Sequence, residues 1–296
     1  MNFTNEKYGN FAKDPAVVSF KGRYYLYHSA LDRSCNKLHI NIAVSDDLEN
    51  WTLTADFPTD LECEKNGVGA PGAIVLDGKV HLFYQTYGNL ERDALCHAYS
   101  EDGINFVKNP ENPVFAPEKT WCCGRAIDAD VCIFNGKLYM YYATRDHAFK
   151  IQKIGGACAE LDSGFGKGAW TPLAHQNLLC PELSWEGECI EAPATVVNNG
   201  KLFMFYGGSY NCTPQQIGCA VSEDGVFFKR VFNTPFIPCG EKGSWNADES
   251  GHPYAFRDND GKVYLFYQGT CDRGSSWYLT KVQIDFDEND LPYIVE

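Results

Sequence analysis

The sequence predicts an all-β fold, a five-bladed β-propeller, and three observations support this prediction. One short pattern recurs five times along the 296 residues: an apolar run, a tight turn that contains glycine, and an aromatic-rich run. Aromatic residues, which are favoured in strands, make up 14% of the chain, and long helical periodicity is absent. Five repeats of four strands give the radial arrangement of a propeller, which protects the sheet edges and leaves a central channel.

Each copy of the pattern is typical of a β-hairpin. The copies cover residues 17–27, 73–84, 131–142, 195–206 and 254–267. Asp-Gly and Asn-Gly dipeptides among the turns supply the positive φ angles that tight hairpins need, and β-branched or aromatic residues flank them. The five turn glycines lie 56, 58, 64 and 61 residues apart, which leaves room for four strands and their loops in each repeat. They are Gly22, Gly78, Gly136, Gly200 and Gly261.

A second pair of strands is expected after each hairpin. Residues 42–51, 97–106 and 219–228 each read as a strand, a Ser/Asp turn and a further strand. The third repeat has a glycine-rich version at 157–170, and the fifth ends with residues 279–284. No linker or break in composition interrupts the repeats, so we expect a single propeller domain over residues 1–296. A two-sheet sandwich is the main alternative, but it does not explain five matched hairpins.

The composition excludes several classes of protein. The chain has 25 Lys and Arg against 39 Asp and Glu, a formal charge of −14 that disfavours binding to nucleic acid or to anionic membranes. Residues 1–10 are polar, and no apolar stretch of about 18 residues occurs, so neither secretion nor membrane insertion is indicated. The thirteen cysteines show no CxxC spacing, as expected for reduced thiols. We therefore expect a cytoplasmic protein.

Carboxylates precede three of the five hairpins: Asp14, Asp128 and Glu191. The first strand of each blade lines the channel, so we expect these residues at equivalent positions near one end of it. Such a cluster suits cation binding, or glycosidic cleavage by an acid and a base. Like charges held close together raise at least one pKa, which keeps a carboxylic acid protonated near neutral pH. The alternative, that Asp14 and Asp128 only cap turns, does not explain three coordinated occurrences.

These blade-leading motifs resemble those of glycoside hydrolase family 43. The resemblance is carried by Asp14-Pro15, Ala126-Ile127-Asp128-Ala129-Asp130, Ile190-Glu191-Ala192-Pro193 and Ser250-Gly251-His252. It implies a five-bladed propeller and inverting hydrolysis, mostly of α-L-arabinofuranosides and β-D-xylosides from plant-wall polysaccharides. Carried over by position, it implies that Asp14 is the general base and Glu191 the general acid. Asp128 would then orient the sugar and tune the acid.

The same resemblance implies a role for His252, which matches a channel histidine that holds a central calcium ion in many relatives. A structural calcium ion is thus the one cofactor expected, with no organic cofactor, and a buried, hydrogen-bonded histidine is the alternative. Two features depart from the family pattern. Gly69 stands before Ala70 where the family usually has tryptophan, which removes one wall of the sugar pocket. Glu188 lies close to Glu191 and is an alternative acid.

Several loop residues are candidate sugar contacts. Trp121, Trp185, Trp245 and Tyr210 lie between blades, where aromatic rings either stack on sugar faces or fill gaps. Arg125 adjoins a channel strand, where it could bind a sugar hydroxyl or hold Asp128 by a charge-assisted hydrogen bond.

The sequence therefore predicts an inverting glycosidase that removes terminal α-L-arabinofuranosyl or β-D-xylosyl residues from oligosaccharides, with no nucleic-acid or membrane partner. One alternative is a retaining fructan- or sucrose-type hydrolase, because Glu188-Cys189 resembles the acid motif of family 32. The opening Asn-Asp-Pro-Asn-Gly motif of that family is replaced here by residues 12–16, Ala-Lys-Asp-Pro-Ala. A second alternative is a propeller that binds carbohydrate without cleaving it, against which the three carboxylates argue.

Overall fold

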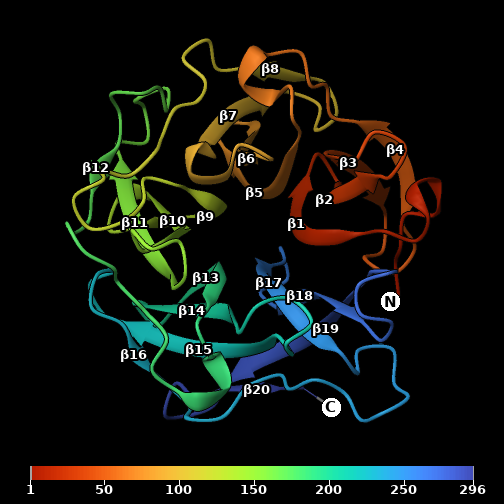
Figure 1. The fold of residues 1–296 in the computed structure, drawn as a ribbon, viewed down its shortest axis with the longest axis vertical. Helices are drawn as coiled ribbons and strands as arrows, with labels where there is room; N and C mark the ends of the chain where they lie inside the picture. The colour runs from red at the N-terminus through yellow and green to blue at the C-terminus, as the bar shows by residue number, and fades with distance from the viewer. Residues whose placement is uncertain (1, 296) are drawn as a thin grey trace.

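Five four-stranded antiparallel sheets surround a central channel (Figure 1). The computed structural model describes residues 2–295, and each sheet takes four strands in chain order, beginning at the channel. The five-bladed β-propeller predicted from the repeats is confirmed. Among the described residues, no helix is long and apolar enough to cross a membrane. All thirteen cysteines are free thiols.

The strands of the five blades have the following bounds. Blade 1 contains β1 (Lys13–Phe20), β2 (Arg23–Asp32), β3 (Lys37–Ser45) and β4 (Thr52–Asp56). Blade 2 contains β5 (Val68–Leu76), β6 (Lys79–Thr86), β7 (Leu95–Ser100) and β8 (Phe106–Lys108). Blade 3 contains β9 (Ile127–Phe134), β10 (Lys137–Arg145), β11 (Gln152–Ala159) and β12 (Thr171–Pro172). Blade 4 contains β13 (Ile190–Asn198), β14 (Lys201–Gly208), β15 (Gln216–Ser222) and β16 (Lys229–Arg230). Blade 5 contains β17 (Glu249–Arg257), β18 (Val263–Thr270), β19 (Tyr278–Phe286) and β20 (Pro292–Ile294).

Short 3₁₀ helices lie before blade 1 and in three of the loops. They are η1 (Glu6–Tyr8), η2 (Glu62–Glu64), η3 (Leu90–Arg92) and η4 (Ser184–Glu186). The hairpins between the first two strands of blades 1 to 4 turn on two residues that both have positive φ, for example 48° at Asp77 and 71° at Gly78. This geometry matches the twist of the flanking strands, which explains why the turn dipeptides predicted the hairpins correctly.

The N-terminal segment closes the ring. Phe11 forms a parallel bridge with Trp277, and Phe3 forms an antiparallel bridge with Leu279. Between blades 3 and 4 the same parallel bridge joins Gln152 to Cys189. Residues 3–12 therefore take the place of an inter-blade connection, and blade 5 meets blade 1 through the same kind of bridge that joins blade 3 to blade 4. Figure 1 shows the closed ring of five blades.

A bulge interrupts the channel strand of every blade at the same position. Strand register shifts there, and the bulge residue has a positive φ: 52° at Asp14, 42° at Ala70, 53° at Asp128, 49° at Ala192 and 43° at His252. A non-glycine residue in this conformation costs roughly 1–3 kcal/mol, and such strain is concentrated at functional sites.

The bulges correct one expectation from the sequence. Asp14 and Asp128 do occupy equivalent positions, but Glu191 lies one residue before the bulge position of its blade, which Ala192 fills. The residue equivalent to both aspartates in blade 5 is His252. The physical reason is that a bulge changes which residue faces which partner, and sequence alignment of apolar runs does not reveal where the extra residue falls.

Candidate active site

Asp14, Asp128, Glu191 and His252 converge at the centre of the ring. His252 Nδ1 lies 2.9 Å from Asp14 Oδ1, and His252 Nε2 lies 3.2 Å from Glu191 Oε1. Donor atoms of Asp128, Glu191 and His252 lie within 4.8 Å of one another. All four side chains are buried, and Asp14, Asp128 and His252 line a narrow central cavity together with four prolines.

A single imidazole ring spans the distance between the predicted base and the predicted acid. The contacts from its two nitrogens place Asp14 Oδ1 and Glu191 Oε1 on opposite sides of the ring. An acid and a base on separate carboxylates are what glycosidic cleavage requires.

Glutamine side chains from neighbouring blades hold the bulges in place. Gln268 Oε1 accepts a hydrogen bond of 3.0 Å from the Asp14 backbone N–H, and Gln85 Oε1 accepts one of 2.8 Å from that of Asp128. Gln215 Oε1 accepts one of 3.2 Å from the backbone N–H of His252. Sequence reasoning missed these residues, although the recurring Tyr-Gln pair at the end of β6 and of β18 was a visible signal. Each bond satisfies a buried donor that the bulge removes from the ladder.

Side-chain amides surround the Glu191 carboxylate. Gln215 Nε2 and Asn211 Nδ2 donate to Glu191 Oε1 over 2.7 Å and 3.3 Å, and Gln152 Nε2 donates to Oε2. Arg145 Nε donates to the oxygen of Gln152 over 2.7 Å, which strengthens Gln152 as a donor. The three amide partners were not predicted, and they favour the ionised form of Glu191.

Burial and pairing push the pKa values of the aspartates apart. Burial alone would raise the pKa of Asp14, but His252 and Lys13 outweigh it and hold that pKa below its usual value. Burial raises the pKa of Asp128 to about 7, and repulsion by Glu191 and Asp14 adds to it while His252 opposes it. Asp14 is therefore ionised at neutral pH, and Asp128 is the carboxyl group that retains a proton.

The other two groups are charged at neutral pH. Burial opposes ionisation of Glu191, but the hydrogen bond and charge of His252 outweigh burial and lower its pKa. Burial also disfavours the imidazolium form of His252, but Asp14 and Glu191 raise its pKa well above the usual value. These opposite pKa shifts favour a proton on Asp128 over one on Glu191, the predicted acid.

Arg125 and Tyr210 lie near the cluster, and Glu188 lies outside it. Arg125 Nε is 3.6 Å from Asp93 Oδ2, and its charge opposes the raised pKa of Asp128. The Tyr210 ring lies 5.1 Å from the Arg145 guanidinium. Glu188 is half exposed and pairs with a surface lysine, so the geometry favours Glu191 over Glu188 as the acid.

The three predicted tryptophans lie away from the carboxylates. Trp185 stacks on Tyr206 with ring centroids 6.2 Å apart, and Trp245 lies 5.9 Å from Tyr267. Both fill space beside a blade, and none of the three lines the central cavity. Trp121 lines a separate cavity between blades 2 and 3. Sugar stacking by these residues stays a prediction that the channel geometry does not support.

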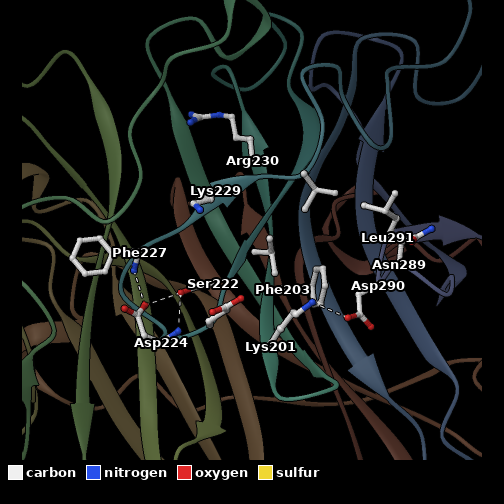
Figure 2. Close-up of a pocket in the computed structure, with 13 residues that line it drawn as sticks. Lys201, Phe203, Ser222, Asp224, Phe227, Lys229, Arg230, Asn289, Asp290 and Leu291 are labelled. Atoms are coloured by element: carbon white, nitrogen blue, oxygen red, sulfur yellow. Dashed lines mark hydrogen bonds and ion pairs between the residues drawn. The ribbon is translucent and has the colours of Figure 1, made fainter.

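A wide groove lies on the outer side of blades 4 and 5, as Figure 2 shows. Its volume is about 520 Å³, and its walls carry Phe227, whose exposed fraction is 73%, and a 2.8 Å ion pair between Lys201 and Asp290. No buried cluster of ionisable groups faces this groove among its described lining residues. The chemistry therefore belongs to the channel.

The side chains of the cluster do not by themselves form a calcium shell. Calcium takes six to eight oxygen ligands, whereas the converging donors are two carboxylates and one imidazole. Both nitrogens of His252 already face carboxylates, and two buried carboxylate oxygens lack a hydrogen-bond partner: Asp128 Oδ2, and Asp14 Oδ1, which contacts His252. The calcium ion stays a prediction.

A buried trio of carboxylates with opposed pKa values at the centre of a β-propeller defines a glycoside-cleaving class of protein. The family model for glycosyl hydrolases family 43 matches residues 4–288, so the chain belongs to this family and is a glycosidase. The resemblance inferred from the blade motifs is confirmed.

Solved structures of similar fold include several enzymes. A thermostable family-43 glycoside hydrolase is 21% identical with a TM-score of 0.78, over 96% of this chain and 93% of that one. An endo-1,4-beta-xylanase from Bacteroides thetaiotaomicron is 18% identical with a TM-score of 0.73, over 96% and 94% of the two chains. An alpha-L-arabinofuranosidase from Lactobacillus brevis is 17% identical with a TM-score of 0.72, over 98% and 97%. At these identities the likeness shows the fold.

Proposed function

We propose that this glycosidase inverts configuration and removes terminal α-L-arabinofuranosyl or β-D-xylosyl residues from plant-wall-derived oligosaccharides. The observation that carries the proposal is the placement of Asp14 and Glu191 on opposite sides of His252, with Asp14 ionised. The names of two structures of similar fold, a xylanase and an arabinofuranosidase, support the choice of sugars.

The proposed reaction is a single displacement at the anomeric carbon. Asp14 accepts a proton from a water molecule. At the same time the oxygen of that water bonds to the anomeric carbon, and the bond between this carbon and the leaving oxygen breaks. Glu191 protonates the leaving oxygen, and the proton comes from Asp128, whose donor atom lies within 4.8 Å of that of Glu191. The proton count balances because this pair of residues loses one proton while Asp14 gains one.

A hydrolysis screen tests the proposal. The substrates are aryl α-L-arabinofuranoside, β-D-xyloside and β-D-galactoside, and sucrose, with Asp14→Asn and Glu191→Gln as inactive controls. We expect cleavage of one of the first two substrates, and NMR of the first product should show the inverted anomer. A first product of retained configuration, or cleavage of sucrose alone, would instead support the fructan-type alternative. Sugar binding without turnover would support the non-catalytic one.

A further inference from the structure

Blade 4 fills the space beside its second strand with three interacting side chains. The Tyr206 hydroxyl on β14 donates to Glu186 Oε1 over 2.7 Å, and Arg230 on β16 donates to both oxygens of Glu186 over 2.7 Å. The Glu186 side chain is fully buried. We call this tyrosine, acid and base arrangement the plug.

Blade 2 repeats the plug. The Tyr84 hydroxyl on β6 donates to Glu64 Oε1 over 2.7 Å, and Lys108 on β8 forms an ion pair with Glu64, whose side chain is fully buried. Lys108 and Arg230 hold the same place, because each pairs with an alanine at the matching register of the third strand.

Blade 3 keeps the tyrosine of the plug and loses its acid and base. Tyr142 on β10 stands at the register position of the other two tyrosines. Cys122 lies six residues before its bulge residue Asp128, as Glu186 lies six residues before Ala192. Pro172 on β12 takes the register position that Arg230 holds in blade 4, since it pairs with Ala157. Blade 3 thus has the tyrosine of the plug without its acid and base.

A cavity of about 480 Å³ lies at this position. Tyr142 and Pro172 line it together with Trp121, Phe115 and Trp170. The Nε1 of Trp170 is buried without a hydrogen-bond partner, and none is found for the Tyr142 hydroxyl among the described residues. Tyr142 and several other aromatic side chains therefore surround a space that the plug fills in blades 2 and 4.

The chemistry of this cavity matches a sugar. The Tyr142 hydroxyl can exchange hydrogen bonds with sugar hydroxyls, and aromatic rings pack against sugar faces. A cavity of this size lies in the range of small-molecule sites. The rim carries Glu118, Lys167 and His175, of both charge signs, which favours a neutral ligand over a strongly charged one. We propose that the cavity is a second carbohydrate site that binds a neutral sugar unit of the substrate glycan, an inference that rests on the proposed function.

Calorimetric titration of the inactive Glu191→Gln enzyme tests the proposal, with xylohexaose and 1,5-α-L-arabinohexaose as probes. In that background, the double variant C122E/P172R rebuilds the plug, and Tyr142→Phe removes one donor. Tyr267→Phe is the matched control, because Tyr267 lies at the same register in blade 5 outside the cavity. Circular dichroism and melting temperature verify the fold of each variant.

We expect two binding events in the parent and one in C122E/P172R, while Tyr142→Phe weakens the second event by roughly three- to tenfold, the loss of one hydrogen bond. Tyr267→Phe should bind like the parent. The same variants with Glu191 intact should hydrolyse aryl glycosides at the parental rate. One binding event in the parent, or two of parental affinity in every folded variant, would overturn the second site. If the enzyme hydrolyses none of the substrates but the rebuilt plug still removes a binding event, the proposed function alone would be overturned.

Discussion

The channel and the plug both use a position that recurs in every blade, but they use it in opposite ways. At the bulge position the blades carry different residues, and three of the four clustered side chains come from those differences: Asp14, Asp128 and His252 against Ala70 and Ala192. At the plug position blades 2 and 4 carry the same arrangement, which serves packing. The comparison teaches that function lies where a repeat departs from itself, and blade 3 departs from the plug of blades 2 and 4.

Replacing Asp14 by Asn has the largest expected effect. The substitution keeps the shape of the side chain and removes the base, so kcat/KM should fall by roughly two to four orders of magnitude. Steady-state kinetics on the substrate found in the screen measures it. Glu188→Gln is the matched control, since Glu188 is half exposed and lies outside the cluster. Equal losses in both variants would break the distinction between channel and surface carboxylates.

Replacing Glu186 by Gln tests the structural side of the comparison. It leaves the buried Arg230 without its main partner, and breaking such a pair typically costs about 3–5 kcal/mol in the free energy of unfolding. Urea denaturation measures the loss. Cys122→Ala, at the same position of blade 3, removes no ion pair and should cost much less. Similar losses in the free energy of unfolding for Glu186→Gln and Cys122→Ala would show that Cys122 stabilises blade 3 as much as Glu186 stabilises blade 4.

The sequence predicted what is local and missed what crosses between blades. Turn dipeptides and apolar runs define each hairpin within a few residues, so the blades, and Asp14 and Asp128 before them, followed directly. The supporting glutamines act on a different blade, as Gln85 does on Asp128, and the fold alone makes them neighbours. Trp185 was expected either to stack on a sugar or to fill a gap between blades, and its ring packs on Tyr206, because loop aromatics beside a blade also complete its packing.

Loss of activity on the alkaline side is the next expected effect. The pKa of Asp128 is raised to about 7, so the proton that the pair supplies is lost as the pH rises through that value. The rate should fall about tenfold per pH unit above it, since only the protonated fraction reacts. A pH profile of kcat/KM measures this limb. A kcat/KM that is constant from pH 6 to pH 9 would show that Asp128 does not supply the proton for the reaction.

Replacing Asp130 has the smallest expected effect. It distinguishes the contribution of Asp130 to stability from that of the clustered acid Asp128. Burial raises its pKa to about 7, and Thr195 of blade 4 donates to it through its backbone N–H over 2.9 Å. Because the folded state binds this proton more tightly than the unfolded chain, Asp130 lowers stability progressively as the pH rises from about 4 to 7. Asp128 has the same raised pKa and contributes to the same slope, so Asp130→Asn should reduce the slope and raise the melting temperature at pH 8 by a few degrees relative to the parent. Melting curves from pH 5 to pH 8 measure both effects. The kcat/KM should stay near its parental value, because Asp130 is not among the converging donors at the centre of the ring. If the slope is unchanged in Asp130→Asn, Asp128 governs it, and the bulge position controls folding as well as catalysis.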